Sequence, residues 1–177
     1  MAKIEVPFDQ YMQQATAALT RDGALITSLD ATGRPNTMTI GWGTLGVIWG
    51  KPIYVALVRP SRYTYGCLEA TGDFTVNIPY PEQDEALVFC GTQSGRDHDK
   101  FAECGFTVLP SATVKSPGIG ECGLIYECRI VHKNDVVPAS LAPDITAYPR
   151  GDYHRMYSGE ILAVRALPDA AALLKQG

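Results

Sequence analysis

Short apolar segments separated by turn-forming residues run through most of the chain. The segment 73–78 alternates most regularly, because Phe74, Val76 and Ile78 are separated by polar residues. This period of two is typical of a β-strand with one buried face. Further strands are predicted at 24–29, 36–42, 52–58, 124–132 and 157–167. The turn-rich segment 30–35 joins the first two of these into a hairpin.

Apolar residues at helical spacing are confined to short segments. Helices are predicted over residues 7–21, 61–70, 81–90 and 97–104. Asp9 and Ser61 are candidate N-terminal caps for the first two. Residues 134–152 contain three prolines and are expected to be loop. Helices this short and irregular do not fit a doubly wound parallel sheet, whereas an antiparallel barrel with helices at its ends and edges accommodates them. The predicted fold class is therefore mainly β with short helices.

Length and composition narrow the class of protein. A chain of 177 residues fits one domain, 1–177. Charged residues make up 19% of the chain, and it contains 17 glycines and 12 prolines, which excludes a coiled coil, a long-helix bundle and a disordered polyampholyte. A net charge of −4 argues against a nucleic-acid surface. A soluble chain with so few charges can bury part of its surface against a second copy, so a homodimer is kept open.

Targeting segments and metal motifs are not apparent in the sequence. The first ten residues carry charges and do not form a signal peptide. The longest apolar stretch, residues 40–50, is too short to span a membrane. The five cysteines and three histidines are scattered without metal-ligand spacing. We therefore expect a cytoplasmic protein with buried thiols, no metal site and no membrane contact.

The segment Asn36-Thr37-Met38-Thr39-Ile40-Gly41-Trp42-Gly43 mixes small polar residues with Met, Gly and Trp at the end of a predicted strand. Its backbone N–H groups could reach a flat ligand, and Trp42 could form a wall beside that ligand. The alternative is an ordinary hairpin with a half-buried tryptophan.

Two further segments place hydroxyl and cationic side chains at the start of predicted helices. The residues concerned are Arg59, Ser61, Arg62 and Thr64 in one segment, and Ser94, Arg96 and Lys100 in the other. The planar guanidinium of arginine donates two parallel hydrogen bonds to phosphate, and a helix N-terminus adds free N–H groups. Neither segment is a Walker A loop or a Rossmann glycine loop. Each alone could be a solvated turn, but two such segments in an acidic chain favour a phosphate site.

His154 lies at the entry to the last predicted strand. An imidazole titrates near neutrality, so His154 could bind a ligand or accept a proton, and a structural role is the alternative. The sequence offers neither a Gly-x-Ser-x-Gly motif nor a Ser-His-Asp arrangement, so it does not favour hydrolase chemistry. No residue is assigned as catalytic.

Taken in order, these segments resemble the flavin reductase-like family of FMN-binding split barrels, in particular its flavoredoxin type. The resemblance rests on Asn36–Trp42, Arg59–Tyr65, Gly72–Asn77, Ser94–Phe101 and His154–Ile161. It implies a six-stranded antiparallel split barrel of Greek-key type, assembled as a homodimer with one FMN per subunit near the dimer interface.

The resemblance also implies roles for individual residues. Asn36, Thr37, Met38, Thr39 and Trp42 would line the isoalloxazine ring, while Ser61, Arg62, Thr64, Ser94, Arg96 and Lys100 would hold the ribityl phosphate. Arg59 and His154 complete the set of candidate cofactor-binding residues.

The function implied by the resemblance is an FMN-dependent oxidoreductase of the flavin reductase type. It would pass electrons from NADH or NADPH through FMN to a small acceptor such as free flavin, ferric iron or a disulfide. One alternative is an FMN-binding electron carrier or flavin store without NAD(P)H activity. Another is a barrel that binds a different phosphorylated ligand, such as pyridoxal phosphate. Nucleic acid ranks last, because the basic segments are short.

Overall fold

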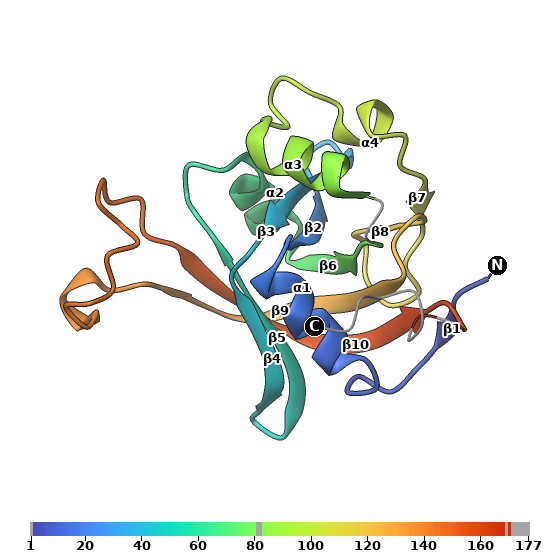
Figure 1. Ribbon diagram of the computed structural model, residues 1–177, viewed down its shortest axis with the longest axis horizontal. Coiled ribbons are helices and arrows are strands. Elements are labelled where there is room, and N and C mark those ends of the chain that lie inside the picture. Colours follow the sequence, from blue (N-terminus) through green and yellow to red (C-terminus); the bar gives the residue numbers. More distant parts are fainter. Residues whose placement is uncertain (1, 81–82, 169, 171–177) are drawn as a thin grey trace.

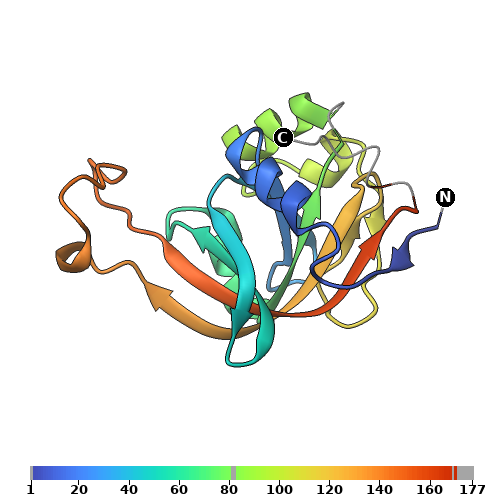
Figure 2. The same cartoon turned by 60° about the horizontal axis from the view of Figure 1, so that its bottom comes forward.

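The computed structural model describes residues 2–80, 83–168 and 170, and an antiparallel sheet dominates it (Figure 1). Its strands are β1 (Ile4–Glu5), β2 (Ala24–Leu29), β3 (Pro35–Ile40), β4 (Gly43–Ile48), β5 (Lys51–Val58), β6 (Asp73–Ile78), β9 (Leu124–Asp135) and β10 (Arg155–Ala166). They are ordered β3-β2-β6-β9-β10-β5-β4, and β1 pairs with β10. A separate ribbon pairs β7 (Val108–Leu109) with β8 (Gly118–Ile119). Figure 2 shows how strongly the main sheet curves.

The alternation in β6 buries both faces of the strand rather than one. Phe74, Val76 and Ile78 belong to the main apolar core. The polar side chains between them lie against the segment that leads into β8 and are also buried. The hydroxyl of Thr75 donates to the carbonyl of Pro117 at 2.7 Å, and the side-chain oxygen of Asn77 accepts from the amide of Ile119 at 2.9 Å. These hydrogen bonds satisfy polar groups that burial removes from water.

Short helices pack around the sheet. They are α1 (Met12–Thr20), α2 (Tyr63–Thr71), α3 (Asp84–Thr92) and α4 (Lys100–Glu103), with a 3₁₀ turn at Pro138–Ser140. Helices α2 and α3 lie beside β2 and β3 (Figure 1). Side chains fasten both to the sheet, because Thr71 donates to the carbonyl of Leu29 and Thr39 donates to the carbonyl of Leu87. These hydrogen bonds hold the two helices against β2 and β3. None of the helices in the described part of the chain is long and apolar enough to cross a membrane.

The expected mainly β, antiparallel fold is confirmed, with corrections to its details. Within the described ranges the main sheet has eight strands rather than six. Residues 43–48 form β4, which sequence reasoning missed because this glycine-rich segment lacks polar alternation. The first residue of α1 follows Tyr11 rather than Asp9, and that of α2 follows Arg62 rather than Ser61. The predicted start of the third helix, residues 81–82, lies outside the described residues.

The segment between β9 and β10, residues 136–154, projects from the body of the molecule as an arm (Figures 1 and 2). As expected, it is irregular apart from one 3₁₀ turn, although residues 134–135 of the predicted loop belong to β9. Arg59 donates to the carbonyls of Ala147 and Asp152 and so ties the arm to the end of β5. The arm is therefore linked to the β5–α2 junction as well as to its own strands.

Candidate functional site

A cavity of about 310 Å³ lies between the end of β3, the β5–α2 junction, the loop from α3 to α4 and the start of β10. Most of the expected site residues line it: Met38, Thr39, Trp42, Arg59, Ser61, Arg62, Thr64, Ser94, Arg96, Lys100 and His154. Its size falls at the lower end of the range for small-molecule pockets. The fold thus gathers at one place side chains that are more than 100 residues apart in the sequence.

Asn36 and Thr37 do not line this cavity. Both are buried, and their side chains serve the surrounding structure instead. Asn36 donates to the hydroxyl of Thr64 at 2.8 Å, and Thr37 donates to the carbonyl of Ile26 at 3.1 Å. Asn36 therefore supports a wall of the cavity from behind, whereas Thr37 stabilises the β2–β3 pair.

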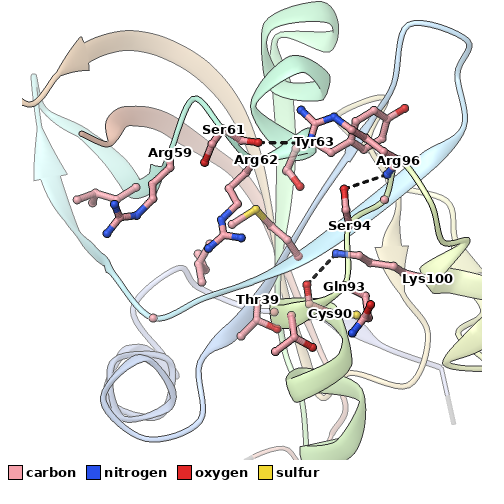
Figure 3. Close-up of a pocket in the computed structure, with 18 of the residues that line it drawn as sticks. Thr39, Arg59, Ser61, Arg62, Tyr63, Cys90, Gln93, Ser94, Arg96 and Lys100 are labelled. Carbon is pink, nitrogen blue, oxygen red and sulfur yellow. Dashed lines mark hydrogen bonds between the residues drawn. The ribbon is translucent and has the colours of Figure 1, made fainter. Parts of the chain in front are cut away.

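Four cationic side chains converge on the cavity, and Figure 3 shows Arg62 extending into its middle. Lys100 is only 4% exposed, and its ammonium donates to the carbonyl of Cys90 at 2.7 Å. Burial lowers the pKa of Lys100, and the charge of Arg62 acts in the same direction. None of these four cations forms an ion pair with a residue that the structure describes. The cavity is therefore built to receive negative charge.

Arg96 is held in place by the β5–α2 junction. Its guanidinium donates to the carbonyl of Ser61 at 3.3 Å and lies 5.5 Å from the centre of the Tyr63 ring. Its backbone N–H donates to the hydroxyl of Ser94 at 3.2 Å. Tyr63 in turn donates to the carboxylate of Asp30 at 3.1 Å. These contacts connect the two loops that carry the cations.

An acidic side chain from the arm reaches the same junction. The carboxylate of Asp152 accepts from the hydroxyl of Ser61 at 2.6 Å and from its amide at 3.3 Å. Asp152 adopts a left-handed backbone conformation, with φ of 56°, which is uncommon for residues other than glycine. The donors of Ser61, expected to hold phosphate, are thus already paired with a carboxylate.

An aromatic wall forms another part of the site, and Arg59 lies against it, with its guanidinium carbon 5.2 Å from the centre of the Tyr148 ring. The ring of His154 lies 4.8 Å from that of Trp42, and its Nδ1 is 3.0 Å from the hydroxyl of Tyr148. Burial, reinforced by the charge of Arg59, lowers the pKa of His154 to about 4. The imidazole is therefore neutral at pH 7.

Sequence reasoning missed several residues of the site. Gly95 lies so close to the β3 side chains that a Cβ at this position would overlap Oδ1 of Asn36. The two glycines of this segment, Gly91 and Gly95, are the sequence signal for such a close approach of the backbone. Asp152 and Tyr148 gave no signal, because they lie in the proline-rich segment and reach the site only through tertiary structure. The described residues contain no cluster of His, Cys, Asp and Glu that could hold a metal ion.

The lining combines cationic and aromatic side chains, which fits a ligand with an anionic group and a flat ring. Residues 17–176 match the family model of the flavin reductase like domain. The chain belongs to this family. The match covers both cation-bearing loops and the aromatic wall, so the cavity lies wholly within the flavin reductase-like region.

Similar proteins agree with this assignment. An uncharacterised protein of Archaeoglobus fulgidus is 30% identical over 131 residues, which cover 74% of this chain and 65% of that protein. The chain thus spans slightly less than two thirds of the length of this curated relative. Flavoredoxin of Desulfovibrio vulgaris (Miyazaki F) is 26% identical, with a TM-score of 0.69 over 83% of this chain and 70% of that chain.

The name of a third similar protein includes FMN. It is the FMN-binding domain of a flavin reductases-like enzyme from Shewanella baltica OS155, 18% identical, with a TM-score of 0.65 over 93% of this chain and 76% of that chain. The expected family and fold are therefore confirmed, and the expected cofactor is the one named for this structural neighbour.

Proposed function

We propose that this flavin reductase-like chain is an FMN-dependent oxidoreductase that takes electrons from NADH or NADPH. One observation carries the proposal: a single cavity combines cationic side chains, which form no ion pair with the described carboxylates, with the apolar and aromatic side chains of Met38, Trp42 and His154. FMN has the matching shape, with a phosphate at one end and a flat ring system at the other. When bound, the flavin supplies the electron-transfer chemistry, while the protein orients it and sets its electrostatic surroundings.

Arg62, Arg96 and Lys100 are the residues that would hold the phosphate. The guanidinium of Arg62 has its full set of N–H donors available, because this side chain makes no hydrogen bond to the described protein residues. Lys100 has three donor hydrogens and one described acceptor, the carbonyl of Cys90. Ser94 and Thr64 add hydroxyl groups to the lining of the cavity. This donor set fits a phosphate dianion better than a neutral ligand.

Met38, Thr39 and Trp42 would lie along the flat ring, with His154 beside Trp42. A neutral imidazole adds no charge to this side of the cavity. Its Nδ1 is engaged by Tyr148, which fixes the orientation of the ring. We assign His154 a positioning role and name no catalytic acid or base.

The visible spectrum of the purified protein tests this proposal. Flavin absorbance is expected, with release of FMN on denaturation, and addition of NADH or NADPH without oxygen should bleach the flavin bands. Bound FMN without bleaching by either nicotinamide would favour the electron carrier or flavin store. A colourless protein that gains no flavin absorbance on incubation with FMN would overturn the proposal, and a released pyridoxal phosphate would replace it.

The proposal includes a homodimer. Within the described sheet β4 is a terminal strand, and Val47, Ile48 and Trp49 at its end are exposed, as is Val131 on β9. Exposed apolar side chains next to an unpaired strand edge are typical of an interface. Light scattering after size-exclusion chromatography should give twice the chain mass of 19.2 kDa, and Trp49→Glu should shift the protein toward the monomer. A wild-type protein that remains at the chain mass would contradict this part of the proposal.

A further inference from the structure

Two cysteines face each other at the base of the loop that carries Ser94, Arg96 and Lys100. Cys90 lies in α3, and Cys104 directly follows α4. Their sulfur atoms are 3.9 Å apart. Cys90 is buried and lines the cavity, whereas Cys104 is partly exposed. Figure 3 shows Cys90 beside Gln93 and below Lys100.

The two cysteines flank the loop that carries the expected phosphate ligands. Residues 91–103 lie between the two thiols and include every expected phosphate ligand of the second segment. A bond between the sulfurs would therefore close this whole loop into a covalent ring. A disulfide has an S–S length of about 2.05 Å, so the sulfurs must approach by roughly 2 Å. Side-chain rotation and a small shift between α3 and α4 can supply that movement.

We propose that Cys90 and Cys104 form a reversible intramolecular disulfide, with a small-molecule disulfide as the oxidant. The site goes beyond the proposed flavin chemistry, because the bond can form whether or not the cavity binds FMN. Its effect on FMN affinity, described below, rests on the proposed function.

The reaction proceeds by two thiol–disulfide exchanges. The thiolate of Cys104, the more exposed sulfur, attacks the small disulfide, forms a mixed disulfide and expels one small thiolate. The thiolate of Cys90 then attacks Sγ of Cys104, closes the protein disulfide and expels the second small thiolate. In sum, the two cysteines lose two electrons and two protons, and the small disulfide gains them as two thiols.

Burial makes this exchange slow rather than preventing it. It raises the pKa of Cys90 to about 12 and also raises that of Cys104. The ammonium of Lys100 opposes the shift at both sulfurs. Because only the thiolate attacks, few molecules can react at any moment, and sustained exposure to oxidant is needed to close the bond.

The disulfide would change the cavity by moving the ammonium of Lys100. Its ammonium is held by the carbonyl of Cys90, the residue whose sulfur must move. Displacing this ammonium removes one charge-assisted hydrogen bond to phosphate, which corresponds to about a tenfold loss of FMN affinity. Oxidation would thus weaken the hold on the cofactor without touching the aromatic wall.

Mass spectrometry before and after digestion tests the bond itself. The full chain is incubated with oxidised glutathione, denatured, alkylated and digested. We expect three alkylated cysteines of the five and a crosslinked peptide that joins Cys90 to Cys104, both restored to free thiols by dithiothreitol. Cys104→Ala and Cys90→Ala should each abolish the crosslink, whereas the matched control Cys67→Ala, at another buried thiol, should retain it. Five alkylated cysteines, a persistent glutathione adduct, or a crosslink to Cys122 would each overturn the proposal.

FMN titration of the same samples tests the effect on the cavity, with quenching of flavin fluorescence as the readout. The oxidised wild type should bind FMN about tenfold more weakly than the reduced form, and Cys104→Ala should bind equally before and after oxidant. Equal affinities of the two wild-type forms would reject the coupling while leaving the disulfide in place. Failure of every sample to bind FMN would reject the proposed function and not the disulfide.

Discussion

The carboxylate of Asp152 lies 2.6 Å from the hydroxyl oxygen of Ser61 and 3.3 Å from its backbone nitrogen. This contact joins the projecting arm to the segment that leads into α2. It also places a negative charge where the expected phosphate ligands converge. Ser61 is consequently engaged within the protein, and the cationic donors of the cavity must hold an anion in the presence of this carboxylate.

Replacing Asp152 by Asn should tighten FMN binding. The substitution keeps an oxygen that can accept from Ser61 but removes the charge that repels phosphate. We expect about fivefold higher affinity, which corresponds to about 1 kcal/mol for an exposed charge pair. Fluorescence titration measures the change, and Asp144→Asn, at an exposed position of the same arm, serves as the control. Weaker binding would mean that the carboxylate orders the site rather than competing with the ligand.

Replacing Arg62 by Ala should weaken FMN binding about tenfold or more, because one charge-assisted phosphate contact contributes roughly 1.5–3 kcal/mol. Riboflavin lacks the phosphate, so its affinity should hardly change. The ratio of the two affinities therefore reports on the phosphate contact alone. Arg129→Ala, on β9 and paired with Glu160, is the matched control. An equal loss for both flavins would place Arg62 at the ring instead.

Gly95→Ala should disturb the loop between α3 and α4. A Cβ at Gly95 would overlap Oδ1 of Asn36 and lie 2.8 Å from Cδ1 of Tyr63. Such overpacking costs about 1–3 kcal/mol of unfolding free energy, and we expect FMN affinity to fall with it. Chemical denaturation and flavin titration measure the two effects. Gly66→Ala, in α2, where a Cβ meets no atom of another element within 4 Å, should cause no loss of either.

The stability of the protein should depend on pH through His154. Burial lowers the pKa of this imidazole from 6.5 to about 4 in the folded state. Between these values the unfolded chain binds the proton and the folded chain does not, so the free energy of unfolding falls as the pH drops from 6.5 towards 4. Above pH 6.5 the contribution is constant.

Denaturation of wild type and His154→Gln at several pH values checks this dependence. The glutamine can still hydrogen-bond to Tyr148 but does not titrate. We expect the difference in unfolding free energy between the two proteins to change between pH 6.5 and 4 and to stay flat from pH 7 to 8. Parallel profiles throughout would show that His154 titrates normally.

Local sequence patterns predicted the features that depend on residues close together in the chain. The alternation of Phe74, Val76 and Ile78 gave β6, and the cations near Arg62 and Lys100 gave one side of the cavity. Side-chain direction was harder to predict. Asn36 was expected in the cavity, but it turns towards Thr64 because α2 packs behind β3, and no local pattern encodes that packing.

Long-range contacts account for the rest of what the sequence did not predict. Asp152 reaches Ser61 across 91 residues, and its segment carries only prolines and turn formers as local signals. The approach of Cys90 to Cys104 likewise depends on how α3 and α4 pack, not on a Cys-x-x-Cys spacing. Strand β4 was missed because a run without polar alternation fits a strand or a buried loop equally well.

The burial of Lys100 has a consequence for the lifetime of the protein. Removing an ammonium from water costs free energy that a single backbone carbonyl only partly offsets. A bound phosphate would offset the remainder, and by mass action a ligand at a hundred times its Kd adds about 2.7 kcal/mol to the unfolding free energy. The fraction of this protein that survives proteolysis in a cell would then rise with the concentration of free FMN. The amount of the protein would therefore report on the supply of flavin.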